Sequence, residues 1–143
     1  MHCVADWHRY LAGTLHGGLH GLLAEDVVFY SPIVFTPQRG RELTALYLSA
    51  AKQVFPGDDT AEVTSSPLGA SFHYRRELMV GHDAVLEFDT VMSGVAVNGV
   101  DMIRCNDEGK ITEFKVMIRP LKAVTIVHER MRAMLEALGT SAP

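Results

Sequence analysis

The chain has 143 residues, of which 48% are hydrophobic and 21% charged, and its formal net charge is −4. This length suits one domain over residues 1–143 with a sizeable core, and a frayed end at Gly139–Pro143. The acidic balance gives no basic surface for nucleic acid or an anionic membrane. No apolar run approaches the ~20 residues of a transmembrane helix, so we expect a soluble globular protein.

The cysteines and histidines give no sign of a disulfide framework or a metal site. The two cysteines, Cys3 and Cys105, are too few for a disulfide framework and do not have the spacing of metal ligands. Cys105 is therefore expected to pack as a small hydrophobe. His16 and His20 are separated by Gly17-Gly18, which breaks the helix that would align them. The N-terminus MHCVADWHRY is unlike a signal peptide, and a reduced, cytoplasmic compartment is the default.

In the first part of the chain, apolar residues recur at helical spacing, which predicts helices. Between these helices lies one segment rich in β-branched and aromatic residues, which predicts a strand. Gly17-Gly18 ends the first helix and Pro32 ends the strand. The predicted elements are a helix over Val4–Leu15, a short helix over Leu19–Leu23, a strand over Asp26–Ser31, a loop over Ile33–Gly40 and a helix over Arg41–Phe55.

The rest of the chain is dominated by alternating apolar and polar residues, which predicts strands, and ends in a helical pattern. The predicted strands are Phe72–Val80, Ala84–Met92, Val95–Cys105 and Lys110–Ile118, with Thr60–Ser71 ambiguous between strand and loop and a final helix from Pro120 to Gly139. Helices before a run of antiparallel strands indicate an α+β fold, with helices packed on one face of a curved sheet.

The clearest stretch is Asn98–Pro120, an alternating hairpin around an Asn-Asp-Glu-Gly turn. Asp101, Ile103 and Cys105 share one face before the turn. After the turn, one face holds Thr112, Phe114, Val116 and Ile118, and the other holds Ile111, Glu113, Lys115 and Met117.

Asp101 is the most informative residue, because a carboxylate on an apolar face is costly unless it is protonated, paired or hydrogen-bonded. One interpretation is a functional acid in a pocket. The other is a structural carboxyl bonded to a loop amide or to Arg39, Arg75 or Arg119.

The order of elements resembles the nuclear transport factor 2-like superfamily, in particular its SnoaL-like branch. The resemblance is carried by Leu22–Pro32 (LLAEDVVFYSP), Pro37–Leu46 (PQRGRELTAL), Ala84–Thr90 (AVLEFDT) and above all Gly99–Pro120. It implies a cone in which a strongly bent, mainly antiparallel sheet of the cystatin-like type wraps around helices and leaves a pocket. It also implies a homodimer formed through the outer face of the sheet.

The segment VDMIRCNDEGKI is similar to the closing hairpin of the ketosteroid isomerases. This similarity places Asp101 at the position of a protonated aspartate that stabilises an oxyanion, and Tyr10 resembles the tyrosine that is the second donor. Where that family has its basic aspartate, this chain has Ser31, which cannot shuttle a proton between carbons. Leu23 and Leu48 stand where the family has supporting tyrosines.

The sequence therefore predicts a pocket for a small hydrophobic ligand, with no metal or organic cofactor. Asp101 and Tyr10 are the candidate catalytic residues, and His73 is a candidate for the missing base. The candidate ligand-binding residues are Trp7, Phe29, Ser31, Tyr47, Phe88, Val97, Phe114, Val116 and Ile118.

Three functions remain open at this point. The first is an acid/base isomerase, cyclase or dehydratase acting on a carbonyl-bearing, steroid-like or polyketide-like molecule, which Asp101 favours. The second is a non-catalytic, dimeric ligand-binding domain, which Ser31 favours. The third is an interaction module whose cone is filled by its own side chains.

Overall fold

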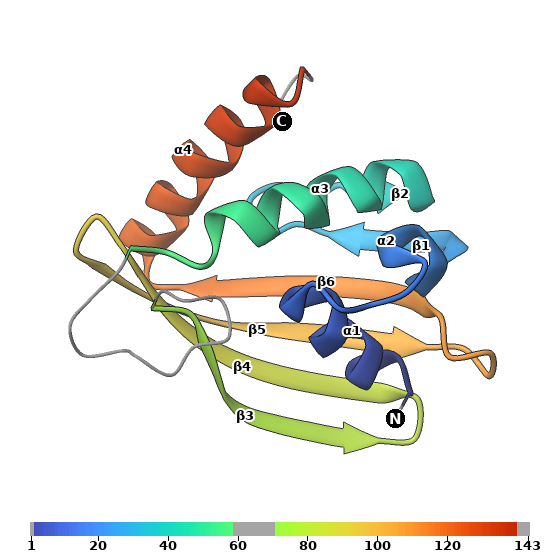
Figure 1. Cartoon of the computed structure of the whole chain (residues 1–143). Helices are drawn as coiled ribbons and strands as arrows, with labels where there is room; N and C mark the ends of the chain where they lie inside the picture. The colour runs from blue at the N-terminus through green and yellow to red at the C-terminus, as the bar shows by residue number, and fades with distance from the viewer. Residues whose placement is uncertain (1, 59–70, 140–143) are drawn as a thin grey trace.

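A computed structural model describes residues 2–58 and 71–139, and it has the α+β architecture expected from the sequence (Figure 1). The predictions over Thr60–Ser71 lie almost wholly outside the described residues, and so does most of the C-terminal tail. The elements are α1 His2–Ala12, α2 Gly18–Leu22, β1 Leu23–Tyr30, β2 Gln38–Arg39, α3 Arg41–Val54, β3 His73–Val80, β4 Asp83–Met92, β5 Val95–Cys105, β6 Ile111–Arg119 and α4 Leu121–Ala137.

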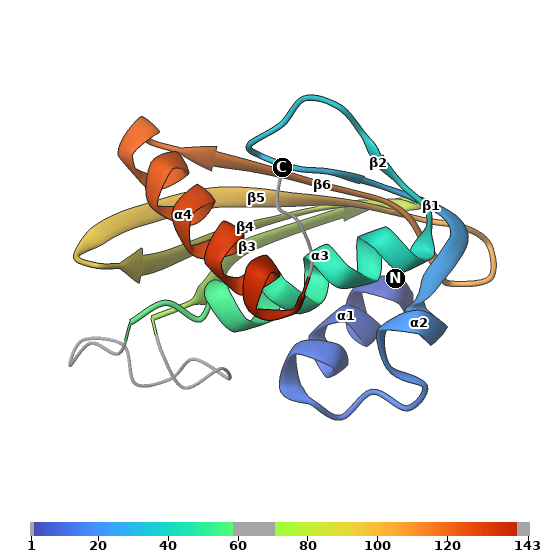
Figure 2. The same cartoon turned by 90° about the horizontal axis from the view of Figure 1, so that it is seen from above.

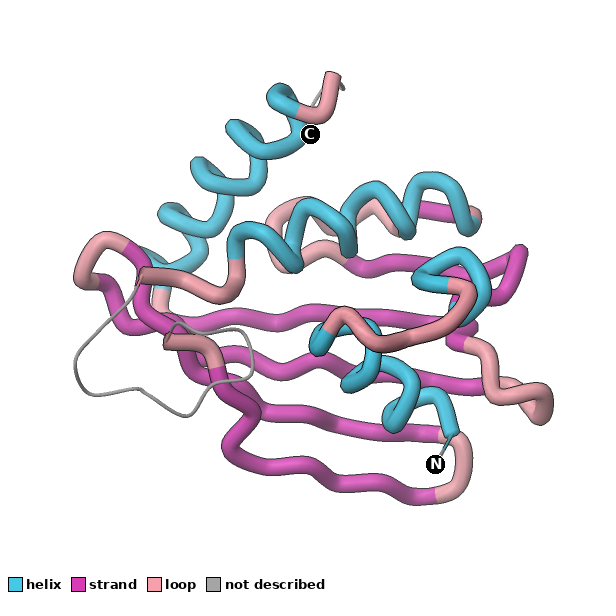
Figure 3. Tube along the Cα trace, in the orientation of Figure 1, coloured by secondary structure: helices cyan, strands magenta, loops and turns pink. Residues whose placement is uncertain are grey.

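The strands form one six-stranded sheet in the order β2-β1-β6-β5-β4-β3. All neighbours are antiparallel except β1 and β6, which are parallel. Seen from above, the helices lie on one side of this curved sheet (Figure 2). The tube view separates the magenta strands of the sheet from the cyan helices that pack against it (Figure 3). The concave face is therefore covered by helices and the convex face is not.

The structure differs from the sequence prediction in two ways before α3: β1 begins earlier than predicted, and a predicted loop contains a short strand. Strand β1 begins at Leu23, three residues before the predicted Asp26. Leu23 pairs with Ile111 of β6. Tertiary pairing thus extends the strand into residues whose local pattern suits a helix. The predicted loop over Ile33–Gly40 contains the short strand β2, which pairs with β1.

The alternation predicted for the two central strands, β4 and β5, is confirmed. Every second residue of β4 is buried, beginning at Ala84 and ending at Met92. Asp101, Ile103 and Cys105 are buried on β5, while Met102 and Arg104 between them are exposed. Alternation in the sequence therefore predicts correctly which residues of the central strands face the interior.

The prediction was wrong at the start of β6, where Ile111 is fully buried instead of facing outward. The pairing shifts between Arg104 and Cys105, which face Glu113 and Ile111 respectively. One extra residue, Thr112, is inserted in β6, and its hydroxyl donates a hydrogen bond to the Arg104 carbonyl at 3.2 Å. Such a bulge reverses the face on which the preceding residue lies.

Gly99 of β5 provides space for an aromatic side chain on the concave face. A Cβ at this position would lie 2.5 Å from the Met117 carbonyl oxygen and 2.6 Å from the ring of Phe88. The missing side chain lets Phe88, its partner on β4, lie across the strand. Phe88 also stacks on Phe72 of the neighbouring chain segment.

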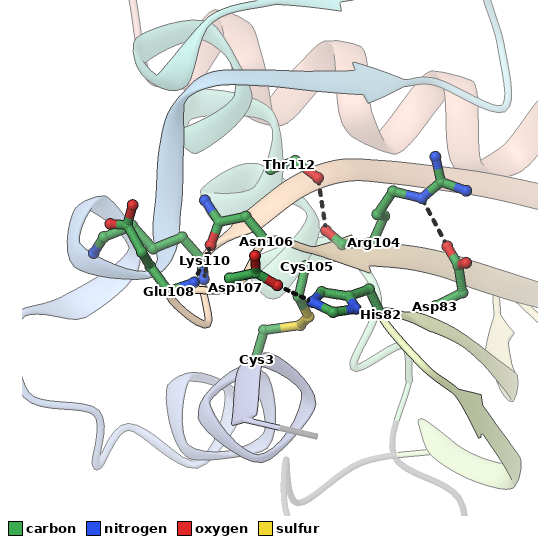
Figure 4. Close-up of a disulfide and its surroundings, with 10 residues drawn as sticks. All are labelled: Cys3, His82, Asp83, Arg104, Cys105, Asn106, Asp107, Glu108, Lys110 and Thr112. Atoms are coloured by element: carbon green, nitrogen blue, oxygen red, sulfur yellow. Dashed lines mark hydrogen bonds and ion pairs between the residues drawn. A yellow bond between two sulfur atoms is a disulfide. The ribbon is translucent and has the colours of Figure 1, made fainter.

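Two cysteines are too few to predict a disulfide framework, and Cys105 was expected to pack as a small hydrophobe, but Cys3 and Cys105 form a disulfide (Figure 4). Both side chains are buried, and their Cα atoms lie 6.2 Å apart. The bond joins α1 to the end of β5 across 102 positions of sequence. Disulfides persist mainly in oxidising compartments, so the pairing argues against a reduced compartment as the default.

The Asn106–Lys110 turn next to this disulfide has the geometry that its residues predict. The Asn106 side-chain oxygen accepts hydrogen bonds from the backbone N–H groups of Glu108 and Lys110, both at 3.0 Å (Figure 4). Gly109 has a φ of 77°, which glycine adopts without strain. In the part of the chain that the structure describes, no helix is long and apolar enough to cross a membrane.

Replacing both cysteines with alanine should lower the free energy of unfolding by about 2–4 kcal/mol, because the unfolded chain loses a long closed loop. Urea unfolding of the wild type and of Cys3→Ala/Cys105→Ala, with and without reductant, measures this. Reductant should destabilise the wild type only. Two reactive thiols per native chain, with equal stability in both conditions, would contradict the assignment.

Candidate functional site

A cavity lies between the concave face of the sheet and the helices α1, α3 and α4. The space between atoms is about 850 Å³, including solvent at its opening. The predicted residues that line it are Trp7, Phe29, Ser31, Tyr47, Phe88, Asp101, Phe114 and Val116. Val97 is buried and Ile118 is partly buried, but neither is part of the lining.

Asp101 lies in the cavity wall and is 6% exposed. It sits in the middle of β5, between Leu86 of β4 and Val116 of β6. The phenolic O–H of Tyr74 donates to Asp101 Oδ2 at 2.5 Å. In turn, Trp7 Nε1 donates to the Tyr74 hydroxyl oxygen at 2.9 Å. A chain of two hydrogen bonds thus links α1, β3 and β5.

No arginine neutralises Asp101 among the described residues. Arg75 forms an ion pair with Asp89 at 2.8 Å, and Arg119 donates to the side chain of Asn98 at 2.8 Å. Arg39 has no ion pair with Asp101 within the described part of the chain. The hypothesis of a structural ion pair is therefore not supported.

Burial is the main influence on the acidity of Asp101, because a carboxylate loses its hydration inside the protein. It raises the pKa of Asp101 from its usual 3.8 to about 7, against the opposing effect of the hydrogen bond from Tyr74. The pKa of Tyr74 is raised well above its usual range, first by burial and then by the negative charge of Asp101. Near neutral pH, Asp101 therefore exists in both protonation states.

Tyr74 is a candidate site residue that the sequence analysis missed, because it lines the cavity and bonds to Asp101. It lies on β3, where it pairs with Phe88 of β4. The signal was available, since alternation places Tyr74 on the same face as Phe72, opposite His73. His73 is exposed, and its ring lies near the Ser71 carbonyl at 3.3 Å, outside the cavity.

Tyr10 does not take the place that the sequence comparison gave it, because it is not part of the cavity lining. Its ring packs on Trp7 with centroids 5.4 Å apart, and Lys52 Nζ lies 4.6 Å from its centroid on another side. Burial raises the pKa of Tyr10, while a hydrogen bond with Ser49 acts in the opposite direction. The tyrosine bonded to Asp101 comes from β3 instead of α1.

Ser31 lines the cavity at the end of β1, as alternation predicted, but its hydroxyl oxygen is occupied by backbone groups. It accepts hydrogen bonds from the N–H groups of Ile33 at 3.0 Å and Val34 at 3.5 Å. These bonds stabilise the turn around Pro32, as a serine after a strand commonly does. Ser31 therefore has a local structural role.

Three further polar side chains line the cavity. They are Lys52 on α3 and His128 and Arg132 on α4. His128 and Arg132 are one helical turn apart and share a face. Among the described residues, no group of three or more His, Cys, Asp and Glu side chains is arranged to hold a metal ion.

Comparisons with solved structures support the fold of this chain. No family model and no curated protein matches the chain. A steroid delta-isomerase from Pseudomonas aeruginosa is 32% identical, with a TM-score of 0.79, over 96% of this chain and 93% of that one. An uncharacterised bacterial protein with a cystatin-like fold, from Silicibacter pomeroyi, is 32% identical with a TM-score of 0.72, over 96% and 86% of the two chains.

A more distant structure extends the likeness at the level of the fold. An NTF2-like protein of unknown function from Mesorhizobium loti is 21% identical, with a TM-score of 0.60, over 83% of this chain and 92% of that one. Together with the two structures at 32% identity over nearly the whole chain, these findings show that the protein belongs to the nuclear transport factor 2-like superfamily.

Proposed function

We propose that this chain is a cofactor-independent acid/base enzyme that acts on a small apolar, carbonyl-bearing molecule of steroid or polyketide type. The reaction would be an isomerisation, a cyclisation or a dehydration. The observation that carries this proposal is a buried carboxyl at an apolar cavity, bonded to a tyrosine and to no cation within the described residues. The similarity to a steroid delta-isomerase supports the isomerase type.

The hydrogen bond with Tyr74 determines how Asp101 can meet a ligand. Tyr74 donates its proton to Oδ2, so that proton is not available to a substrate. Oδ1 has no hydrogen-bond partner among the described residues and belongs to a side chain in the cavity wall. In the protonated acid, Oδ1–H donates to a ligand carbonyl, and this bond strengthens as negative charge develops on the carbonyl oxygen.

A second proton-transfer group is needed for an isomerisation, because a proton must leave one carbon and reach another. Ser31 does not suit this task, since its hydroxyl oxygen serves the following turn. His128 lies in the same lining on α4, and histidine is the side chain that most often serves as a general base. We assign His128 the role of base in place of the expected His73.

A non-catalytic binding domain is the second candidate function, and the occupied hydroxyl of Ser31 favours it. In that case Asp101 would orient a carbonyl ligand without transferring a proton. The third candidate, an interaction module with a filled cone, is disfavoured by the cavity. Membership of the SnoaL-like branch stays a prediction. A cytoplasmic location also stays a prediction, and the disulfide between Cys3 and Cys105 does not favour it.

A homodimer formed through the convex face of the sheet also stays a prediction. Met102 and Met117 are 37% and 48% exposed on that face, where no helix lies (Figure 2). Light scattering should give twice the chain mass, and Met102→Glu/Met117→Glu should give the monomer mass by placing charges in the contact. A monomeric wild type at high concentration would refute the dimer.

Asp101→Asn and Asp101→Leu should separate hydrogen bonding from proton transfer. Asparagine keeps an N–H donor, so apolar ketones should still raise its melting temperature, whereas leucine should abolish that shift. Both variants should lose turnover by about 10²–10³-fold if Asp101 transfers a proton. Thermal shift with steroid enones and aromatic ketones measures binding, and absorbance of the conjugated product measures turnover.

Asp107→Asn is the matched control, because Asp107 lies on the turn after β5 and contacts only His82 at 2.7 Å among the described residues. It should behave as the wild type. Equal ligand shifts in the wild type and in Asp101→Leu would overturn the assignment of Asp101. Unchanged turnover in Asp101→Asn with intact binding would favour an oriented hydrogen bond over proton transfer.

The free energy of unfolding should decrease as pH rises, and the size of this decrease should depend on Asp101. Because its folded-state pKa of about 7 exceeds the unfolded-state value of 3.8, the folded protein binds more protons between these values. The stabilisation from protonated Asp101 is complete at low pH and is lost as pH rises through about 7. Between about pH 5 and 8, the wild type should lose about 2–3 kcal/mol relative to Asp101→Asn.

Urea unfolding of both proteins across this range measures the difference. Tyr74→Phe gives a second check, because removing a hydrogen bond that favours the ionised acid should move the inflection to higher pH. Parallel stability curves for the wild type and Asp101→Asn would show that Asp101 titrates as an ordinary surface acid.

A further inference from the structure

The charges that line the cavity differ in sign from those of the whole chain. The sequence has 17 acidic residues and 13 basic ones. Among the described residues of the lining, the only acidic side chain is the buried Asp101, whereas Lys52 and Arg132 are both basic. The charged side chains at the opening of the cavity are therefore basic, and their surroundings indicate which ligand group they would bind.

Lys52 lies near the end of α3 with its ammonium group above an aromatic ring. Nζ lies 4.6 Å from the centroid of the Tyr10 ring, and the residue is partly buried. Among the described residues, no carboxylate lies within 4.0 Å of Nζ. A lysine in this setting packs its methylene groups along apolar surface and keeps its charge toward solvent.

Arg132 lies on α4 and is exposed, which places its charge at the open side of the cavity. It has no ion pair within the described residues. Arg130, two residues earlier, points elsewhere and pairs with Asp58 at 3.0 Å. Helices α3 and α4 cross on the concave side of the sheet (Figure 2), so the two basic residues come from adjacent helices over one cavity.

We propose that the ligand carries an acidic group, such as a carboxylate, in addition to its apolar body. Lys52 and Arg132 bind this group at the open side of the cavity, while the body lies among the aromatic side chains and faces Asp101. The inference rests on the proposed function, because it takes the cavity as the ligand site. It narrows the substrate class from apolar carbonyl compounds to acidic ones.

Asp101 and Arg132 differ in burial, and this difference supports a ligand with a carbonyl-bearing end and a separate acidic end. Asp101 is 6% exposed and accepts a hydrogen bond from a tyrosine, whereas Arg132 is exposed. An acidic group placed beside Asp101 would meet a second carboxyl, with electrostatic repulsion whenever Asp101 is ionised. The acidic end is therefore better placed beside the basic side chains.

A matched pair of fluorescent probes tests this inference. The probes 1-anilinonaphthalene-8-sulfonate and N-phenyl-1-naphthylamine differ only by the sulfonate, and both fluoresce more strongly in apolar surroundings. Dissociation constants are measured for the wild type and for Lys52→Gln/Arg132→Gln. Competition between the probes establishes that they share one site.

The wild type should bind the sulfonate probe more tightly than the neutral one. The double variant should lose about fivefold of that preference, as expected for partly exposed charge pairs. Its affinity for the neutral probe should stay within about twofold. Lys115→Gln/Arg119→Gln is the control, because it removes the same charge from exposed positions on β6 outside the cavity and should keep the preference.

The possible failures are distinguishable. If both probes bind competitively and the double variant keeps the full sulfonate preference, the inference fails while the proposed function stands. If the control pair loses the preference equally, general surface charge explains it and the inference also fails. If neither probe binds the wild type, the cavity does not take apolar molecules, and the inference and the proposed function both fail.

Discussion

The hydrogen bond from Tyr74 to Asp101 is the interaction on which the site depends. It is the only hydrogen bond that Asp101 makes to the described side chains, and it occupies one of the two carboxyl oxygens. A buried carboxylate normally needs several donors or a cation to offset lost hydration. With one neutral donor, the acid keeps its proton to much higher pH than an exposed aspartate does. Burial with a single neutral donor is therefore the physical reason that the pKa of Asp101 is raised to about 7.

The same interaction requires three distant segments to meet. Trp7, Tyr74 and Asp101 come from α1, β3 and β5. The order of strands brings Tyr74 toward Asp101 through the intervening β4, where Phe88 pairs with Tyr74 and fills the space over Gly99. The curvature of the sheet and the packing of α1 thus act together to bury the Asp101 carboxyl and to place Tyr74 beside it. The basic residues Arg75 and Arg119 bond to Asp89 and Asn98, so neither of them neutralises Asp101.

The features that could be predicted from the sequence are those set by local periodicity. The strands around Asp101 alternate strictly, so the burial of Asp101 and its neighbours on one face follows from residue order alone. The features that could not be predicted depend on pairing between distant residues. Ile111 faces inward because of one inserted residue at a register shift. Cys3 meets Cys105 only after α1 is placed on the sheet.

The donor to Asp101 illustrates the same limit within the site. A tyrosine on the first helix matched a family pattern, but the helix presents Trp7 to the cavity and turns Tyr10 toward Lys52. The tyrosine bonded to the acid belongs to β3. Its identity follows from the register of the β3–β4 hairpin, which places Tyr74 opposite the inward-facing Phe88. The position of Asp101 can be predicted from one sequence, whereas the identity of its partner, Tyr74, depends on how the strands pair.

The disulfide has a consequence for how a ligand could reach the cavity. Cys3 lies one helical turn from Trp7, and Cys105 lies on the same strand as Asp101. Helix α1 is thus fixed to the sheet by a covalent bond at one end and by the Trp7 hydrogen bond along its length. It cannot swing away without breaking that bond. Helix α4, by contrast, is joined to the sheet covalently only through Pro120 among the described residues, and otherwise packs by side chains such as Val127 and Leu135. A ligand that enters beside α4 would require no covalent bond to break, whereas α1 is held against the sheet by the disulfide.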